Sequence, residues 1–103
     1  MSTQEVAAKI ESWAKDRNLV QGSTVQAQLN KLVEEIGELA KGINKHSHIK
    51  VLDGIGDAAV VLVIMAAQMG VTLEDCMELA YNEIKDRKGK MINGIFVKES
   101  DLT

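Results

Sequence analysis

The sequence predicts an all-α protein in which four helices form a bundle and a short β-hairpin follows them. Proline is absent from the 103 residues, so long helices are permitted throughout the chain. Apolar residues recur at helical spacing, most regularly between residues 29 and 43. Near the end of the chain, apolar residues flank Asn93-Gly94, a dipeptide that is typical of hairpin turns.

The first two helices are separated by the polar stretch "QGST". The first helix is expected over about residues 3–18, where apolar side chains recur on one face. Ser23 or Thr24 can cap the second helix, which is expected to run to about Asn44. The apolar residues of this second helix form a strong helical stripe, so we expect one of its sides to face the core.

The third helix is expected over about residues 48–69, and Gly70 suits the position just after its end. The motif "TLED", residues 72–75, is a variant of the capping box and begins the fourth helix, which is expected to end near Gly89. Nothing in the sequence resembles a linker or an internal repeat. We therefore interpret residues 1–103 as one domain.

In the second half of the third helix, the residues on every side of the helix are apolar. The stretch "AAVVLVIMAA", residues 58–67, contains no polar side chain. A helix of this kind is buried on several sides, and three neighbouring helices in one chain do not readily supply that much burial. We therefore expect a second chain to complete the bundle, as a homodimer or a homotetramer.

The composition excludes several classes of protein. A net charge of −3 lacks the basic excess that proteins binding polymeric nucleic acid usually carry. The longest apolar run has about half the length needed to span a bilayer, and "MSTQEVAAKI" has no signal-peptide pattern. Cys76 is the single cysteine and cannot form an intramolecular disulfide. We expect a cytoplasmic protein with no membrane partner.

The second helix carries a cluster of three glutamates, Glu34, Glu35 and Glu38. They fall within an arc of about 100° around the helix, opposite most of its apolar stripe. Taken alone, such a cluster is most simply interpreted as an acidic face in contact with water. The third helix changes this interpretation.

Asp53 and Asp57 of the third helix are four residues apart, so they lie on the same helical face. That row continues into the apolar run, where an ionised carboxylate is costly unless it has a partner. Two helices joined by a short loop are expected to be antiparallel, which brings Glu35 and Glu38 opposite the two aspartates. Carboxylates that converge without a counter-charge predict a divalent cation, and oxygen ligands favour Mg²⁺ or Mn²⁺.

Two glycines stand beside these carboxylates. Gly37 and Gly54 remove side-chain bulk where a substrate would approach, or else allow the two helices to come close together. The sequence leaves both explanations open.

The end of the fourth helix is locally basic. Asn82 and Lys85 are three residues apart, and Arg87 follows in the stretch "YNEIKDRKGK". Positive charge at this place can simply favour a helix C-terminus. The functional alternative is a phosphate clamp that faces the metal site, because a metal with a basic clamp is the general arrangement for phosphoryl chemistry.

The motifs "EEIGE", "DGIGD" and "NEIKDRKGK", in this order, resemble the MazG-like branch of the all-α nucleoside triphosphate pyrophosphohydrolases. That family has the pattern E-E-x-x-E, then E-x-x-D, then N-x-x-K, and the resemblance covers about residues 25–98. It implies a MazG fold and a Mg²⁺-dependent enzyme that cleaves a nucleoside triphosphate between its α and β phosphates. The products implied are a nucleoside monophosphate and pyrophosphate.

The resemblance also implies roles for individual residues. Metal ligands are implied at Glu35, Glu38 and Asp57, and phosphate contacts at Asn82 and Lys85. Glu34 matches the leading glutamate, which would help to hold a further metal or orient a water. As our own hypothesis, Glu34 or Glu35 takes the proton of the attacking water, and Arg87 acts with Lys85. The glutamate of E-x-x-D is Gly54 in this chain, and Asp53 is its evident substitute as a fourth ligand.

Two alternatives remain at this stage. The chain could be a catalytically silent dimerisation or nucleotide-binding module, for which Gly54 is the best argument. It could also be an enzyme that acts on a relative of these substrates, such as phosphoribosyl-ATP.

Overall fold

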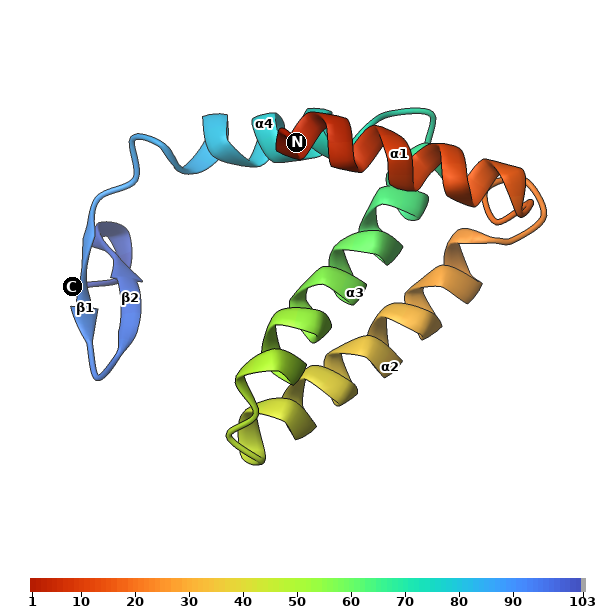
Figure 1. Cartoon of the computed structure of the whole chain (residues 1–103). Helices are drawn as coiled ribbons and strands as arrows, with labels where there is room; N and C mark the ends of the chain where they lie inside the picture. The colour runs from red at the N-terminus through yellow and green to blue at the C-terminus, as the bar shows by residue number, and fades with distance from the viewer. Residues whose placement is uncertain (103) are drawn as a thin grey trace.

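A computed structural model describes residues 1–102 and shows four helices followed by a two-stranded antiparallel sheet (Figure 1). The all-α class and the C-terminal hairpin are therefore confirmed. The helices are α1 (Thr3–Asp16), α2 (Val25–Asn44), α3 (His48–Gln68) and α4 (Leu73–Ile84), and the strands are β1 (Gly89–Ile92) and β2 (Ile95–Lys98). A short 3₁₀ turn, Glu99–Asp101, follows the sheet.

Each helix begins at a hydroxyl side chain that caps it. Ser2, Thr24, Ser47 and Thr72 each accept a hydrogen bond from the backbone N–H three residues later, which satisfies one of the free donors at the helix start. The predicted capping box is present in full, because Asp75 also accepts a bond from the Thr72 backbone N–H at 3.0 Å.

The fourth helix ends at Ile84, five residues earlier than expected from the sequence. The four residues after Ile84 are all charged and exposed, so no apolar side chain packs there to hold another turn of helix. The hairpin turn follows the expectation closely. Asn93 and Gly94 have φ values of 52° and 80°, the positive pair that a type I′ turn requires, and Ile92 pairs with Ile95 across it.

The helices form an open arrangement (Figure 1). α2 and α3 lie side by side as an antiparallel pair, and α1 lies across the end where α3 finishes. α4 leads away from that end and carries the sheet at its far side. We refer to α4 and the hairpin after it, residues 73–102, as the arm. The buried apolar residues of the described chain are Ala14, Val61, Val63, Ile64 and Ala66, so this core lies where α1 meets the second half of α3.

The close packing of α2 against α3 depends on two glycines. A Cβ atom on Gly54 would lie 3.1 Å from the Cα of Leu39, and one on Gly42 would lie 3.1 Å from the Cβ of Lys50. Gly54 therefore allows a close helix–helix contact, one of the two explanations left open above. Gly37 differs, because a Cβ there would meet nothing within 4 Å.

Much apolar surface remains exposed in the single chain. No large side chain of the described residues is fully buried, and Val33 of α2 and Tyr81 of α4 each keep 62% of their surface exposed. None of the helices in residues 1–102 combines the length and the apolar content needed to cross a bilayer.

The contact at Gly54 yields a stability prediction. Gly54→Glu would restore the glutamate of the E-x-x-D pattern, but its side chain would press on the α2 backbone at Leu39. We expect the free energy of unfolding to fall by about 1–3 kcal/mol, the usual cost of overpacking a tight contact. Urea denaturation followed by circular dichroism measures it.

Gly56→Ala is the matched control, since a Cβ at position 56 meets nothing within 4 Å. It should raise stability by up to about 1 kcal/mol through helix propensity. A Gly54→Glu protein as stable as the parent would show that the two helices can separate without cost.

Candidate functional site

Five carboxylates lie along one side of the α2–α3 pair and are called the acidic flank: Glu34, Glu35 and Glu38 of α2, and Asp53 and Asp57 of α3. Two of them meet where the helices touch. The Glu35 side chain is only 15% exposed and lies within hydrogen-bonding reach of the half-buried Asp57. The antiparallel pairing predicted from the sequence therefore brings Glu35 opposite Asp57.

The electrostatics at this contact disfavour two negative charges. Burial raises the pKa of Asp57 above its ordinary value of 3.8, and the neighbouring carboxylates of Asp53 and Glu35 raise it further. Lys31 acts in the opposite direction and lowers this pKa. Asp57 is thus a carboxylate whose ionised form lacks sufficient compensation from the protein itself.

Lys31 is the feature that the sequence interpretation missed. Its Nζ lies 3.3 Å from Glu35 Oε1 and 3.6 Å from Glu34 Oε2, so the acidic flank has a counter-charge within its own helix. Those contacts raise the pKa of Lys31, with the hydrogen bond to Glu35 as the main cause. The expectation that the carboxylates converge without a counter-charge was therefore wrong. The i,i+4 spacing of Lys31 and Glu35 was the available signal.

The other two proposed ligands, Glu38 and Asp53, are more exposed to solvent than Glu35 and Asp57. The Glu38 side chain is 65% exposed and lies 3.4 Å from Lys41 Nζ, and Asp53 is exposed one turn before Asp57. Within residues 1–102, no three acidic, histidine or cysteine side chains come close enough together to hold a metal ion. The structure assembles the pair Glu35–Asp57, and the four-ligand set stays a prediction.

The basic residues lie elsewhere, on the arm. Asn82 is in the last turn of α4, Lys85 follows as its C-cap, and Arg87 lies in the turn after it; all three are exposed. Figure 1 shows the arm leading away from α2 and α3, so one chain does not bring these residues to its own acidic flank. A wide hollow of about 560 Å³ at this end of the arm is bordered by charges of both signs, including Glu83, Arg87 and Lys98.

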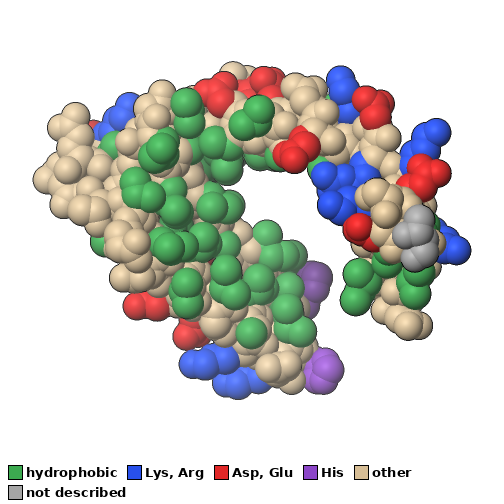
Figure 2. Space-filling view, turned by 180° about the vertical axis from the view of Figure 1, so that it is seen from behind, with side chains coloured by type: hydrophobic (Ala, Val, Ile, Leu, Met, Phe, Trp, Pro, Cys, Tyr) green, Lys and Arg blue, Asp and Glu red, His purple; other side chains and the backbone are tan. Residues whose placement is uncertain are grey.

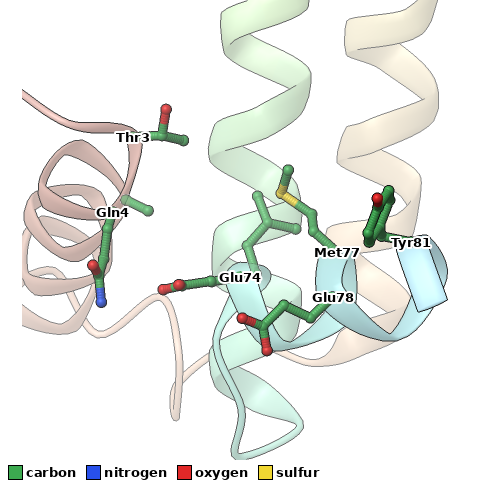
Figure 3. Close-up of a pocket in the computed structure, with 8 residues that line it drawn as sticks. Thr3, Gln4, Glu74, Met77, Glu78 and Tyr81 are labelled. Carbon is green, nitrogen blue, oxygen red and sulfur yellow. The ribbon is translucent and has the colours of Figure 1, made fainter. Parts of the chain in front are cut away.

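An apolar groove of about 410 Å³ separates α4 from the first turns of α1 (Figure 3). Met77 and Tyr81 of α4 form much of its apolar wall, and Gln4 of α1 faces Glu74 across it. None of the predicted site residues lines this groove. It marks a place where the arm and α1 do not pack closely.

Residues 23–92 match the family described as MazG nucleotide pyrophosphohydrolase domain, and this range contains both the acidic flank and the basic end of α4. The chain belongs to this family. The resemblance inferred from "EEIGE", "DGIGD" and "NEIKDRKGK" is thereby confirmed.

A relative of this MazG domain occurs in Haemophilus phage HP1 (strain HP1c1), where it is described as "Uncharacterized 18.2 kDa protein in rep-hol intergenic region". The two are 51% identical over 65 residues. The aligned part covers 63% of this chain and 40% of the relative, so the match spans less than half of that longer protein. No solved structure matches the chain.

The raised pKa of Asp57 yields a prediction for pH dependence. The folded chain holds the Asp57 proton more tightly than the unfolded chain does, so stability falls as pH rises from about 3.8 through the raised pKa. Asp57→Asn removes this fall, and we expect the variant to be more stable than the parent at neutral pH without divalent metal. Thermal unfolding of both proteins between about pH 3 and about pH 7 measures the difference in stability.

The response to Mg²⁺ distinguishes a metal ligand from a carboxylate whose pKa is raised only by burial and by neighbouring negative charges. We expect saturating Mg²⁺ to raise the melting temperature of the parent and not that of Asp57→Asn, because a ligand stabilises only the state that binds it. Asp101→Asn, an exposed change outside the acidic flank, should keep the parent's response. Equal responses of all three proteins to Mg²⁺ would argue against Asp57 as a ligand.

Proposed function

We propose that this MazG domain is a Mg²⁺-dependent nucleotide pyrophosphohydrolase. It cleaves an NTP or a dNTP between the α and β phosphates and releases the monophosphate and pyrophosphate. The main support is that the range matching the family, residues 23–92, contains the contact at which Glu35 of α2 meets Asp57 of α3.

Glu35, Glu38, Asp53 and Asp57 are the proposed ligands of the cation. Their chemistry fits Mg²⁺, with Mn²⁺ as the alternative, because all four supply carboxylate oxygens. The raised pKa of Asp57 fits as well, since a nearby cation would favour its ionised form. When bound, a divalent cation lowers the pKa of a water and offsets negative charge on phosphate oxygens.

A glutamate of α2 is the proposed proton acceptor. The attacking water forms a bond to the α-phosphorus, the bond to the α–β bridging oxygen breaks, and Glu34 or Glu35 takes the water's proton. Glu35 is nearer to Asp57, whereas the Glu34 side chain is 69% exposed and is held only by a 3.6 Å contact to Lys31. Glu35 is thus better placed and Glu34 is freer to move.

The basic residues of the arm are the proposed phosphate contacts. Asn82 donates hydrogen bonds to phosphate oxygens, and Lys85 and Arg87 balance the charge that develops on the departing pyrophosphate. Arg87 can form two parallel hydrogen bonds to a phosphate, whereas Lys85 acts as a single positive charge.

A second function is favoured by one specific observation. Gly54 stands where the family pattern has a glutamate, and a Cβ there would lie 3.1 Å from the Cα of Leu39, so α2 would have to shift to admit that side chain. A catalytically silent dimerisation or nucleotide-binding module would explain this departure. Pyrophosphate release decides between the two functions, because a silent module binds nucleotide without releasing pyrophosphate.

Removing one proposed ligand tests the enzyme directly. In a pyrophosphate-release assay across NTPs and dNTPs, we expect Glu38→Gln to lower kcat by at least about 100-fold, as loss of a strong electrostatic contribution does. Chelation of divalent metal should abolish turnover by the parent.

Glu11→Gln is the matched control. Glu11 pairs with Lys15 on α1 at 2.8 Å, so the change removes a glutamate charge outside the acidic flank and should leave kcat unchanged. Full turnover by the parent in EDTA would refute metal dependence.

Asp53 tests the departure from the family pattern. Asp53 lies one turn before Asp57 and is exposed, so its carboxylate can approach the cation from the side. We expect Asp53→Asn to raise the Mg²⁺ concentration needed for half-maximal activity. A Mg²⁺ titration that overlays the parent curve would assign Asp53 to favourable charge in the first turns of α3 instead.

A further inference from the structure

Two lysines of α2 lie at the ends of its glutamate cluster. Lys31 is one turn before Glu34 and Glu35, and Lys41 is one turn after Glu38. Within residues 1–102, these are the two basic residues that form ion pairs with the acidic flank. Figure 2 shows basic side chains beside acidic ones at the end of the helix pair that carries both histidines. The glutamates of the flank therefore have positive partners before any cation binds.

The ion pair of Lys31 is the better protected of the two. Its Nζ lies 3.3 Å from Glu35 Oε1, and the Glu35 side chain is only 15% exposed. Lys41 Nζ lies 3.4 Å from Glu38 Oε1, but these side chains are 69% and 65% exposed. Water and salt screen an exposed pair more strongly than a partly buried one. Lys31 therefore holds its carboxylate more firmly than Lys41 does.

The charge of Lys31 also acts across the contact between the two helices. It lowers the pKa of Asp57 on α3, whereas the carboxylates of Asp53 and Glu35 raise that pKa. One ammonium group thus offsets negative charge on both helices. A cation held by Glu35 and Asp57 would carry its charge at the same place, where two positive charges repel each other strongly.

We propose that Lys31 is a positioning residue that lowers the affinity of the acidic flank for divalent cations, because it holds Glu35 in the metal-free chain and has to release it when the ion binds. The inference rests on the proposed function for the presence of the cation. The competition itself involves neither nucleotide nor turnover.

This exchange favours divalent over monovalent cations. A monovalent cation carries no more charge than the ammonium group that it would replace, so it gains no extra attraction to Glu35. A divalent cation carries twice that charge, and its attraction to Glu35 and Asp57 exceeds that of the lysine. Lys31 therefore excludes Na⁺ and K⁺ from the flank more effectively than it excludes Mg²⁺ or Mn²⁺.

Titration with Mn²⁺ tests the competition. Mn²⁺ takes the same oxygen ligands as Mg²⁺, and electron paramagnetic resonance measures the free ion over protein that has been stripped of metal. We expect Lys31→Met to bind Mn²⁺ at least about threefold more tightly than the parent, because methionine keeps the helix propensity of lysine without its charge. Lys31→Arg keeps the charge and should stay within about twofold of the parent.

Two other lysines serve as controls, because each replacement by methionine changes the net charge by the same amount. Lys41→Met should tighten Mn²⁺ binding less than Lys31→Met does, since both partners of its ion pair are exposed. Lys15→Met should leave the affinity unchanged, because Lys15 pairs with Glu11 on α1, outside the acidic flank.

Salt and heat provide two further measurements. The difference in affinity between Lys31→Met and the parent should nearly vanish at about 1 M NaCl, where charges are screened beyond about 3 Å. At one fixed, subsaturating concentration of Mg²⁺, the melting temperature should rise more for Lys31→Met than for the parent. The physical reason is that tighter binding stabilises the folded chain more.

Mn²⁺ binding by Lys31→Met that is equal to or weaker than that of the parent would overturn the inference, since a lysine that only orients Glu35 for the ion raises the affinity. A difference that persists undiminished at high salt would assign the effect to packing and would also overturn it. A parent that binds no Mn²⁺ at millimolar concentration would refute the inference together with the metal site. Tighter binding by Lys31→Met in a protein that releases no pyrophosphate would refute the proposed function and leave the inference supported.

Discussion

The close approach of α2 and α3 determines the position of the other features. It is possible because Gly42 and Gly54 present no side chain where the helices touch, with Leu39 and Lys50 filling the space opposite. The approach holds Glu35 against Asp57 and raises the pKa of that aspartate. The residue that departs from the family pattern, Gly54, is therefore also a residue on which the geometry of the carboxylates depends.

The helix pair separates two kinds of surface. One side concentrates carboxylates and the other concentrates aliphatic side chains. Within residues 1–102, Glu38 and Asp53 on the first side and Ile36 and Ile55 on the second stay exposed. The few buried apolar residues near α1, all alanine, valine or isoleucine, provide only a small core. A domain of this size that leaves large apolar side chains exposed has little hydrophobic stabilisation of its own.

Local features were predictable from the sequence, and long-range placement was not. Thr72, Asp75, Asn93 and Gly94 act on backbone groups only a few residues away, so their types and spacing were enough to predict the cap and the turn. The opposition of Glu35 and Asp57 was predictable because one short loop joins their helices. The direction of the arm was not, because it depends on surfaces that carry no local pattern.

The spacing of Lys31 and Glu35 shows a second limit of prediction from the sequence. Its i,i+4 relation to Glu35 was visible in the sequence, but the same spacing is common on helices that have no function. Only the half-buried position of Asp57 beside that pair shows that Lys31 influences a carboxylate on another helix. The role of Lys31 therefore became visible only when α3 was seen packed against α2.

Lys31 is a counter-charge for the acidic flank that is covalently part of the chain, whereas a dissolved cation would be free to diffuse away. Its contact with Glu34 joins two exposed side chains, and ion pairs of this kind are weak and are screened by salt, whereas the Glu35 side chain is only 15% exposed. A divalent ion bound at the proposed site would displace a counter-charge that is tethered to the chain and cannot diffuse away. After that ion left, Lys31 would again lie beside Glu34 and Glu35 and offset part of their charge.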